Sequence, residues 1–168
     1  MKIKNLFFKV ISKIIQITDD FDHKQNLNKL QFKGENIKVD HRVHIINPEM
    51  VAIGSNTSIS SYTTIFGTHG VTIGENCWIS SSVGISSYNH IMNSSNRHRD
   101  KYLDYKYCKP VVIGDNVWIA MNVTILPGCV VGNNSIIGAG SVVNKNIPPN
   151  EIWVGNPARF IKRIDLIS

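Results

Sequence analysis

His90 is the residue in this sequence whose type and position best suit acid–base chemistry. It ends the string ISSYNH at 85–90, and the segment that follows it breaks the pattern of the rest of the chain. An imidazole is mostly uncharged at neutral pH and can take a proton from a hydroxyl or amine, so His90 is a candidate general base. The alternative is a histidine that is exposed at a turn and has no chemical role. The structural elements around His90 help to decide between these two interpretations.

The elements around His90 follow a six-residue repeat. Its inward positions are three runs of aliphatic residues, namely Ile53, Ile59, Ile65; Ile73, Ile79, Ile85; and Ile113, Ile119, Ile125, Val131, Ile137, Val143. A helix would place apolar residues every three or four positions, so each unit is better read as one short strand and a corner. Three units then form one coil of a prism of parallel strands, because each aliphatic side chain stacks on the one a coil below.

A second pattern marks where each coil begins. The phrase aliphatic-Gly-x-Asn starts at Ile53, Ile73, Ile113 and Val131. From Ile113 to Val131 the interval is 18 residues, whereas from Ile53 to Ile73 it is 20, which predicts a small bulge around 70–72. The interval of 40 from Ile73 to Ile113 contains one coil plus an excursion at 91–112. Less regular units at 39–43 and 45–46 are expected to form the first coil.

Three later segments are similar to a known family. They are 110–128, 138–149 and 154–162, with the sequences PVVIGDNVWIAMNVTILPG, GAGSVVNKNIPP and VGNPARFIK. Over roughly residues 35–163 the chain resembles the hexapeptide-repeat acyltransferases, in particular their sugar O-acetyltransferase branch of maltose, galactoside and polysaccharide enzymes. The resemblance implies an all-β, left-handed parallel β-helix, with an N-terminal helical segment at 1–34, a loop at 91–112 and a C-terminal tail at 164–168.

The resemblance also implies an activity. It implies that a homotrimer moves an acetyl group from acetyl-CoA to a hydroxyl of a sugar or polysaccharide precursor, directly in a ternary complex, with His90 as general base. N-acetylation of a nucleotide-linked amino sugar and a β-helix that only binds partners are the alternatives.

By the same resemblance, the acetyl-CoA site involves eight residues. Trp118 would lie beside the catalytic histidine, and a backbone N–H near Ala120 or Met121 would face the thioester and stabilise an oxyanion. Ala139 and Asn144 would contact the pantetheine arm. The nucleotide phosphates would be contacted by Lys145, Arg159 and Lys162. The simpler interpretation of Trp118 is an exposed aromatic residue at a strand corner. The three cations could likewise belong to a solvated basic tail.

On the acceptor side the similarity is weaker. Ser60 and about Thr68 occupy positions where maltose- and galactoside-type relatives carry Asn and Asp, so we expect a different acceptor. His69, Tyr88 and Asn89 join Ser60 as candidate substrate contacts. The charged cluster at 96–102 belongs to a long loop, which is expected either to arch over the acceptor or a neighbouring subunit or to be simply solvated.

The first 17 residues have apolar residues at helical spacing with lysines between them. The pattern predicts an amphipathic helix that packs on the prism or a neighbouring subunit, or one that associates weakly with a membrane surface. Lys9 and Lys13 interrupt the apolar run, and no cleavage site precedes Asp19, so neither a membrane span nor a signal peptide is expected.

Composition narrows the remaining possibilities. The formal charge of +6 favours an anionic partner, but the cations are spread out and carry no nucleic-acid motif, so nucleic acid is not expected. Three cysteines form no disulfide framework and fit a reducing compartment, which indicates the cytoplasm. A helix at the N-terminus that associates with a membrane would place the protein near the inner face of that membrane.

Metal and cysteine chemistry are not expected. A metal-dependent prism of the carbonic anhydrase type needs three histidines on adjacent coils, and the spacing of His41, His44, His69 and His90 does not supply them. Cys77 and Cys129 fall at small inward positions, and Cys108 lies in the loop without a sequence-evident base, so none is a convincing nucleophile.

Overall fold

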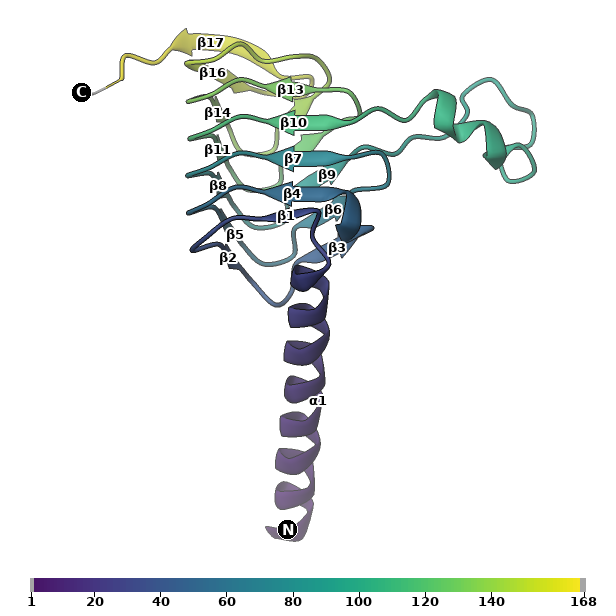
Figure 1. Cartoon of the computed structure of the whole chain (residues 1–168), viewed down its shortest axis with the longest axis vertical. Coiled ribbons are helices and arrows are strands. Elements are labelled where there is room, and N and C mark those ends of the chain that lie inside the picture. The colour runs from purple at the N-terminus through teal and green to yellow at the C-terminus, as the bar shows by residue number, and fades with distance from the viewer. Residues whose placement is uncertain (1, 167–168) are drawn as a thin grey trace.

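The computed structural model describes residues 2–166 and contains one long helix and a three-sided prism of short strands (Figure 1). The elements are α1 (Lys2–Asn28), β1 (Phe32–Lys33), β2 (Lys38–Val39), β3 (His44–Ile46), η1 (Pro48–Met50), β4 (Val51–Ile53), β5 (Ser58–Ile59), β6 (Thr64–Phe66), β7 (Val71–Ile73), β8 (Trp78–Ile79), β9 (Gly84–Ser86), η2 (Lys101–Lys106), β10 (Val111–Ile113), β11 (Trp118–Ile119), β12 (Thr124–Ile125), β13 (Val130–Val131), β14 (Ile136–Ile137), β15 (Val142–Val143), β16 (Glu151–Val154) and β17 (Arg159–Arg163).

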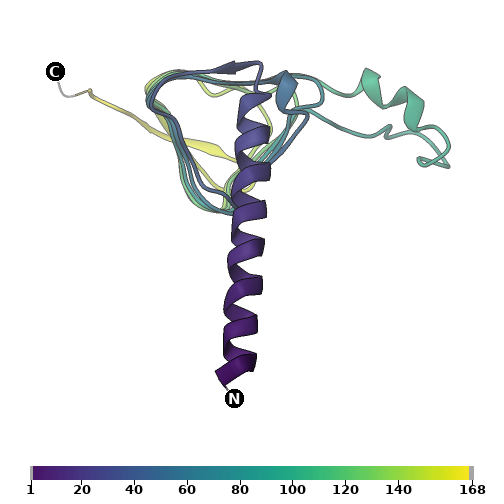
Figure 2. The ribbon, with the colours of Figure 1, turned by 60° about the horizontal axis from the view of Figure 1, so that its bottom comes forward.

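The strands form three sheets, one for each side of the prism (Figure 2). Sheet A has the order β1-β4-β7-β10-β13, sheet B has β17-β16-β14-β11-β8-β5-β2, and sheet C has β15-β12-β9-β6-β3. Every pairing is parallel except the last, between β16 and β17. Up to β15, successive strands of the chain lie on successive sides, so each of these coils contributes one strand to each sheet. The expected all-β parallel β-helix is confirmed.

The six-residue period is the spacing of the buried core. Ile53 pairs with Ile73, Ile73 with Ile113, and Ile113 with Val131 across sheet A, and each of these side chains is at most 1% exposed. The fourth step of each unit also points inward, where Cys77 and Val117 are buried. Each coil therefore buries apolar surface only against its neighbours, which makes the stack cooperative.

The phrase aliphatic-Gly-x-Asn has a steric explanation at the corners. A Cβ on Gly54 would lie 2.5 Å from the backbone carbon of Gly74 in the next coil, so only glycine fits. Asn56 and Asn76 turn the chain with φ of 58° and 57°, a left-handed conformation that asparagine tolerates. Stacked asparagines also bond along the corner, as Asn116 Nδ2 does to Asn134 Oδ1 at 3.0 Å.

All irregular insertions fall at one corner, between sheets C and A, which we name the loop corner. It holds η1 in the first coil, residues 67–70 in the second and residues 87–110 in the third. The bulge expected around 70–72 is therefore centred slightly earlier, because Thr72 is already paired within β7. Likewise, Val111 and Val112, which were assigned to the loop, belong to β10.

The two ends of the prism differ from its middle. The first coil begins at β1, before the expected units at 39–43, and both residues of β1 are exposed. At the other end, β16 and β17 form an antiparallel pair on the last coil. The tail beyond residue 163 carries no regular element up to residue 166, and residues 167–168 lie outside the described part.

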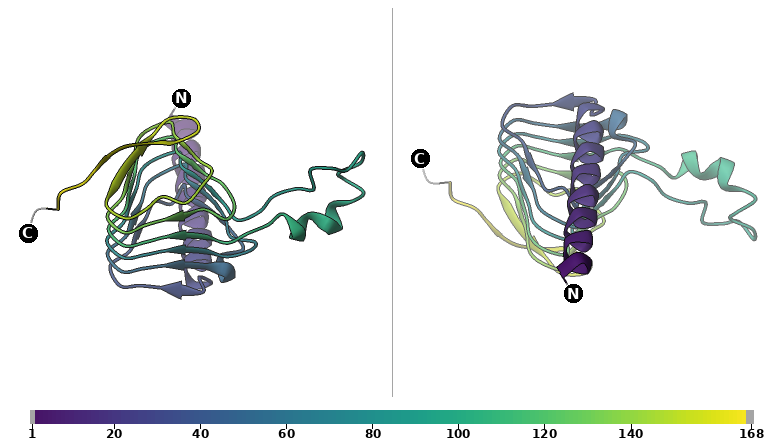
Figure 3. Two further views of the ribbon diagram at one scale, coloured as in Figure 1. Left: turned by 90° about the horizontal axis from the view of Figure 1, so that it is seen from above. Right: turned by 90° about the horizontal axis from the view of Figure 1, so that it is seen from below.

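Helix α1 contacts the prism only near its C-terminal end. Leu27 packs against the core together with Leu30, and His23 Nε2 lies 3.0 Å from the carbonyl oxygen of Val39. The rest of the helix projects beyond the first coil (Figures 1 and 2), and it overlaps the prism in the views from above and below (Figure 3). Over residues 2–166, no helix is both long and apolar enough to cross a bilayer.

Candidate active site

His90 lies at the loop corner, four residues after the last residue of β9, at the start of the long excursion. Figure 1 shows this excursion leaving the prism between β9 and β10. Its side chain is 64% exposed. The ring of Tyr88 packs edge-on against it, with 4.9 Å between the ring centroids. The imidazole is therefore accessible to a substrate while one side of it is held by a neighbour.

Asp104 fixes the orientation of that imidazole. This carboxylate lies in η2, is 4% exposed, and accepts a hydrogen bond from His90 Nδ1 at 2.8 Å. It also accepts bonds from the Tyr88 hydroxyl at 2.5 Å and from the Ile91 N–H at 2.8 Å. Sequence reasoning missed Asp104, because it stands 14 residues from His90 in a loop without a repeat and only the folded loop brings the two together.

The protonation state of this cluster follows from its hydrogen bonds. The Tyr88 hydroxyl, followed by the Ile91 N–H and His90, holds the pKa of Asp104 below its usual 3.8, although burial acts in the opposite direction. An ionised carboxylate only accepts hydrogen bonds, so His90 Nδ1 carries the hydrogen. The lone pair is then on Nε2, which can take a proton from a substrate.

Tyr88 supplies the first testable consequence. Its hydrogen bond to Asp104 is the main cause that raises the pKa of Tyr88 from 10.0 to about 12. A raised pKa means that this contact is complete below pH 10 and is lost as the pH rises through about 12. Tyrosine ionisation can be followed by the ultraviolet absorbance of phenolate during a pH titration. We expect the wild type to show one ionisation near pH 12 that is missing in Tyr88→Phe. Asp104→Asn should move that ionisation towards lower pH, and a Tyr88 that ionises near pH 10 in the wild type would contradict the contact.

The root of the loop is closed by Cys108. Its thiol is buried, receives the Asn89 N–H at 3.3 Å, and lies 3.2 Å from the carbonyl oxygen of Asp104. The Asn89 side chain in turn accepts the N–H of His90 at 2.9 Å. Cys108 therefore packs the loop against the corner, a structural position that agrees with its rejection as a nucleophile.

His69 lies next to Tyr88 on the neighbouring coil. Its N–H donates to Ser87 Oγ at 2.9 Å, and its ring centroid is 6.4 Å from that of Tyr88. Nδ1 of His69 is buried and has no hydrogen-bond partner among the described residues. The structure thus brings two of the four expected acceptor contacts, Tyr88 and Asn89, to the cavity beside His90, whereas His69 lies next to Tyr88 and does not line that cavity.

Ser60, the fourth expected contact, lies elsewhere in the single chain. It is at the corner between sheets B and C and lines a separate cavity of about 670 Å³ with Leu27 and Ser81. The cavity beside His90, of about 420 Å³, is instead formed by the outer face of sheet C, with Phe66, Gly84 and Thr124 among its lining residues. One chain therefore does not bring Ser60 to His90.

Trp118 is also separated from His90. It stands 48% exposed on the outer face of sheet B, paired in register with the exposed Trp78, and the two line a cavity of about 360 Å³. At the adjoining corner, Met121 and Ala139 are stacked, since the Gly140 N–H donates to the Met121 carbonyl at 2.9 Å. The expectation that Trp118 lies beside the histidine does not hold within one chain, because sheets B and C are different sides of the prism.

The backbone N–H groups of Ala120 and Met121, the two expected donors to an oxyanion, are not equivalent. The Ala120 N–H donates to the carbonyl oxygen of Ile137 at 2.9 Å, as part of the coil-to-coil ladder. That donor is already used, which corrects the expectation for Ala120 and leaves the neighbouring Met121 N–H as the candidate.

The remaining expected contacts lie near the last coils. Asn144 is exposed at the loop corner, above the level of His90, and Lys145 places its Nζ 4.9 Å from the Trp153 ring centroid. Arg159 and Lys162 are exposed on β17. These cations surround the top of the prism rather than the cavity beside His90.

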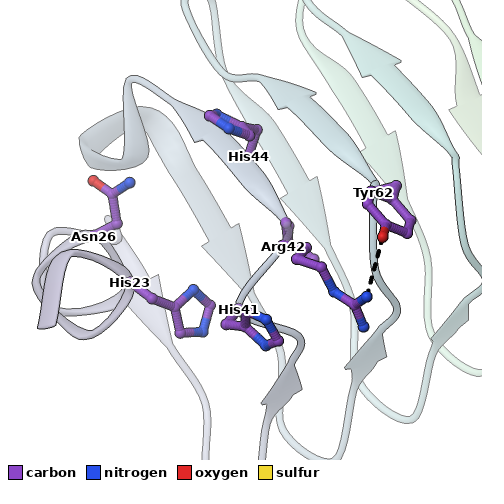
Figure 4. Close-up of a pocket in the computed structure, with 7 residues that line it drawn as sticks. His23, Asn26, His41, Arg42, His44 and Tyr62 are labelled. Atoms are coloured by element: carbon purple, nitrogen blue, oxygen red, sulfur yellow. Dashed lines mark hydrogen bonds between the residues drawn. The ribbon is translucent and has the colours of Figure 1, made fainter. Parts of the chain in front are cut away.

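A further cavity of about 560 Å³ lies where α1 meets the first coils (Figure 4). It is lined by polar side chains that include His23, His41, His44 and Arg42. Arg42 is already bonded to Asp40 and to the Tyr62 hydroxyl, at 3.2 and 3.1 Å. No group of three His, Cys, Asp or Glu residues within the described part of the chain is placed to hold a metal ion, in this cavity or elsewhere.

Comparison with known proteins agrees with this architecture. A family profile described as bacterial transferase hexapeptide (six repeats) matches residues 110–145. Galactoside O-acetyltransferase of Escherichia coli (strain K12) is 36% identical over 148 residues, which cover 87% of this chain and 71% of that protein. The putative lipopolysaccharide biosynthesis O-acetyl transferase WbbJ of the same strain is 34% identical over 140 residues, covering 77% and 70%.

A solved structure adds the acyl donor. The hexapeptide-repeat acetyltransferase of Vibrio cholerae O1 biovar eltor, complexed with acetyl-coenzyme A, superimposes with a TM-score of 0.73 at 28% identity. The alignment covers 83% of this chain and 74% of that one.

Proposed function

This chain belongs to the hexapeptide-repeat acetyltransferase family and is an acetyl-CoA-dependent acetyltransferase, and we propose that it acetylates a hydroxyl of a sugar or polysaccharide precursor with His90 as general base. The observation that carries the proposal is the contact between His90 Nδ1 and the buried carboxylate of Asp104, at 2.8 Å. It leaves Nε2 as a proton acceptor next to an open cavity on sheet C.

The proposed reaction is a direct transfer in a ternary complex. The acceptor hydroxyl gives its proton to His90 Nε2 as its oxygen bonds to the thioester carbonyl carbon, which forms one tetrahedral intermediate. The carbon–sulfur bond then breaks, the coenzyme A thiolate leaves, and it takes the proton back from the imidazolium. Asp104 stabilises the positive ring between these steps, and the Met121 N–H is the proposed donor to the developing oxyanion.

We also propose a homotrimer whose active site is shared. His90 faces the outer side of sheet C, whereas Trp118, Met121 and Ala139 belong to sheet B or its corner. A neighbouring chain that brings its sheet B against this sheet C would complete the site, and in a closed ring each chain contributes to two sites. The cytoplasm, where free cysteines persist, is part of the same proposal.

The nucleotide phosphates of acetyl-CoA are assigned to the cations of the last coils. We expect Arg159→Ala/Lys162→Ala to raise the KM for acetyl-CoA about tenfold while kcat changes little, because these contacts hold a part of the donor remote from the reacting carbon. Steady-state thiol release at varied acetyl-CoA concentration measures both constants. Lys33→Ala, which removes a cation from the opposite end of the prism, is the control; an unchanged KM in the double variant would move the phosphates elsewhere.

The acceptor is identified by a screen. Thiol release from acetyl-CoA is followed with free sugars, nucleotide sugars and amino sugars, and the product is examined by mass spectrometry and NMR. The proposal expects release that depends on a sugar hydroxyl and an ester product. An amide product on an amino sugar would replace O-acetylation, and a protein that releases thiol with none of these acceptors would reject the proposed substrate class.

A further inference from the structure

The outer part of α1 carries a large apolar surface that none of the described residues of the prism covers. Nine residues between positions 6 and 21 are each at least 37% exposed, and they are Leu6, Phe7, Phe8, Val10, Ile11, Ile14, Ile15, Ile17 and Phe21. Among the described residues, the prism contacts only the last turns of the helix, through His23 and Leu27. Figures 1 and 2 show this outer part projecting away from the prism. A continuous apolar surface of this kind marks an interaction site.

The apolar residues occupy one side of the helix. At 3.6 residues per turn they span about half of its circumference, and Lys9, Ser12 and Lys13 lie on the other half. The row at Phe7, Ile14 and Phe21 has the spacing of a coiled-coil seam. However, Phe8 and Ile15 lie well to one side of that row and would remain in water, so the face is wider than a helix seam needs.

The charges on the helix are separated along its length. Residues 1–18 include lysines at 2, 4, 9 and 13 and no acidic residue. The first carboxylates of the chain are at 19, 20 and 22, closer to the prism. Residues 6–18, which hold eight of the nine exposed apolar residues, therefore combine a broad apolar face with positive charge alone. This combination fits an anionic lipid surface, which attracts lysines and accepts apolar side chains at its boundary.

We propose that α1 lies on the surface of a membrane that contains anionic lipids. Phe7, Ile11 and Ile14 enter the boundary between head groups and acyl chains, and Lys9 and Lys13 face the lipid phosphates. The helix rests on the surface and does not span it. If three chains assemble as proposed above, three such helices act together and strengthen the binding. The proposal does not otherwise depend on the acetyl-transfer reaction.

Co-sedimentation of the full chain with vesicles tests this inference. We expect binding to vesicles of phosphatidylcholine mixed with phosphatidylglycerol, and much weaker binding to phosphatidylcholine alone. Lys9→Glu/Lys13→Glu should weaken the binding at least about 30-fold, because two charges that favour the surface are lost and reversed. Phe7→Ser/Phe8→Ser should release the protein as well. Tyr102→Ser/Tyr105→Ser, which removes two exposed aromatic rings from η2, is the matched control and should still bind.

Other outcomes overturn the inference. A wild-type protein that stays in the supernatant with the mixed vesicles rejects it, and so does equal binding by Lys9→Glu/Lys13→Glu. If light scattering shows that Phe7→Ser/Phe8→Ser lowers the mass of the lipid-free protein, the face is covered by other copies instead of lipid. Acetyl transfer to a soluble acceptor is measured on the same variants and should match the wild type, so that loss of binding is distinguished from failure of the enzymatic proposal.

Discussion

His90→Ala should lower kcat for acetyl transfer by about 10² to 10⁴ and leave the KM for acetyl-CoA nearly unchanged. The reason is that the variant keeps the cavity on sheet C and the contacts to the donor, but removes the group that takes the hydroxyl proton in the transition state. The side chain is 64% exposed and belongs to no part of the core, so the melting temperature should change little. Steady-state thiol release and a thermal melt measure the two quantities.

Asp104→Asn should cause a fall in kcat that approaches the effect of losing His90. The two oxygens of Asp104 accept from Ile91 on one side, and from Tyr88 and His90 on the other. An asparagine that keeps its oxygen towards the Ile91 N–H turns its NH₂ towards His90 Nδ1. His90 Nδ1 must then accept a hydrogen bond, so the ring hydrogen moves to Nε2. With Nε2 protonated, the ring can no longer take a proton from the substrate.

This arrangement has a spectroscopic signature that a purely structural role would not produce. In nitrogen-15 NMR, the wild type should show His90 protonated at Nδ1, and Asp104→Asn should show it protonated at Nε2; the signal is assigned by its absence in His90→Ala. Asp100→Asn makes the same chemical change at a carboxylate of the same loop that pairs with Arg99, and serves as the control. Full activity of Asp104→Asn with the altered tautomer would reject His90 as the base.

The sequence could predict the prism because its coils are periodic. Aliphatic residues at every sixth position identify the inward strand residues, and the repeated Gly and Asn identify a corner where the next coil leaves no room for a Cβ. The first strand of the first coil, β1, escaped this reasoning although Gly34 and Asn36 repeat the corner. Lys33 replaces the aliphatic residue there, since an end coil is covered on one side only and its inward position need not be apolar.

The site was predictable only where it follows the repeat. His90 could be found because it ends a unit at the point where the repeat breaks. Asp104 could not, because its place beside His90 depends on how an irregular loop folds back, with Cys108 closing the root. The repeat also does not reveal that the Ala120 N–H donates to the carbonyl oxygen of Ile137 in the next coil, whereas Met121 is a corner residue.

Two inactive variants should restore activity when they are mixed within one trimer. His90→Ala removes the base from sheet C, and Ala139→Trp places an indole at the exposed corner where the donor is proposed to bind. If each site combines His90 of one chain with the corner of its neighbour, a randomly mixed trimer contains intact pairs. A trimer that contains both kinds of chain has both partners at one of its three sites, so the isolated mixed trimers should recover about a third of wild-type turnover.

The experiment uses chains co-expressed with different affinity tags, so that mixed trimers can be isolated and their mass determined by light scattering. Each variant alone should have very low turnover. Mixing the two variants after separate assembly should restore none, and light scattering with tag capture checks that no mixed trimers form during the assay. A mixed trimer as inactive as its parents would show that base and donor site belong to one chain. The separation of His90 from Trp118 and Ala139 on different sides of the prism would then need loop movement within the chain, rather than a neighbour, to close it.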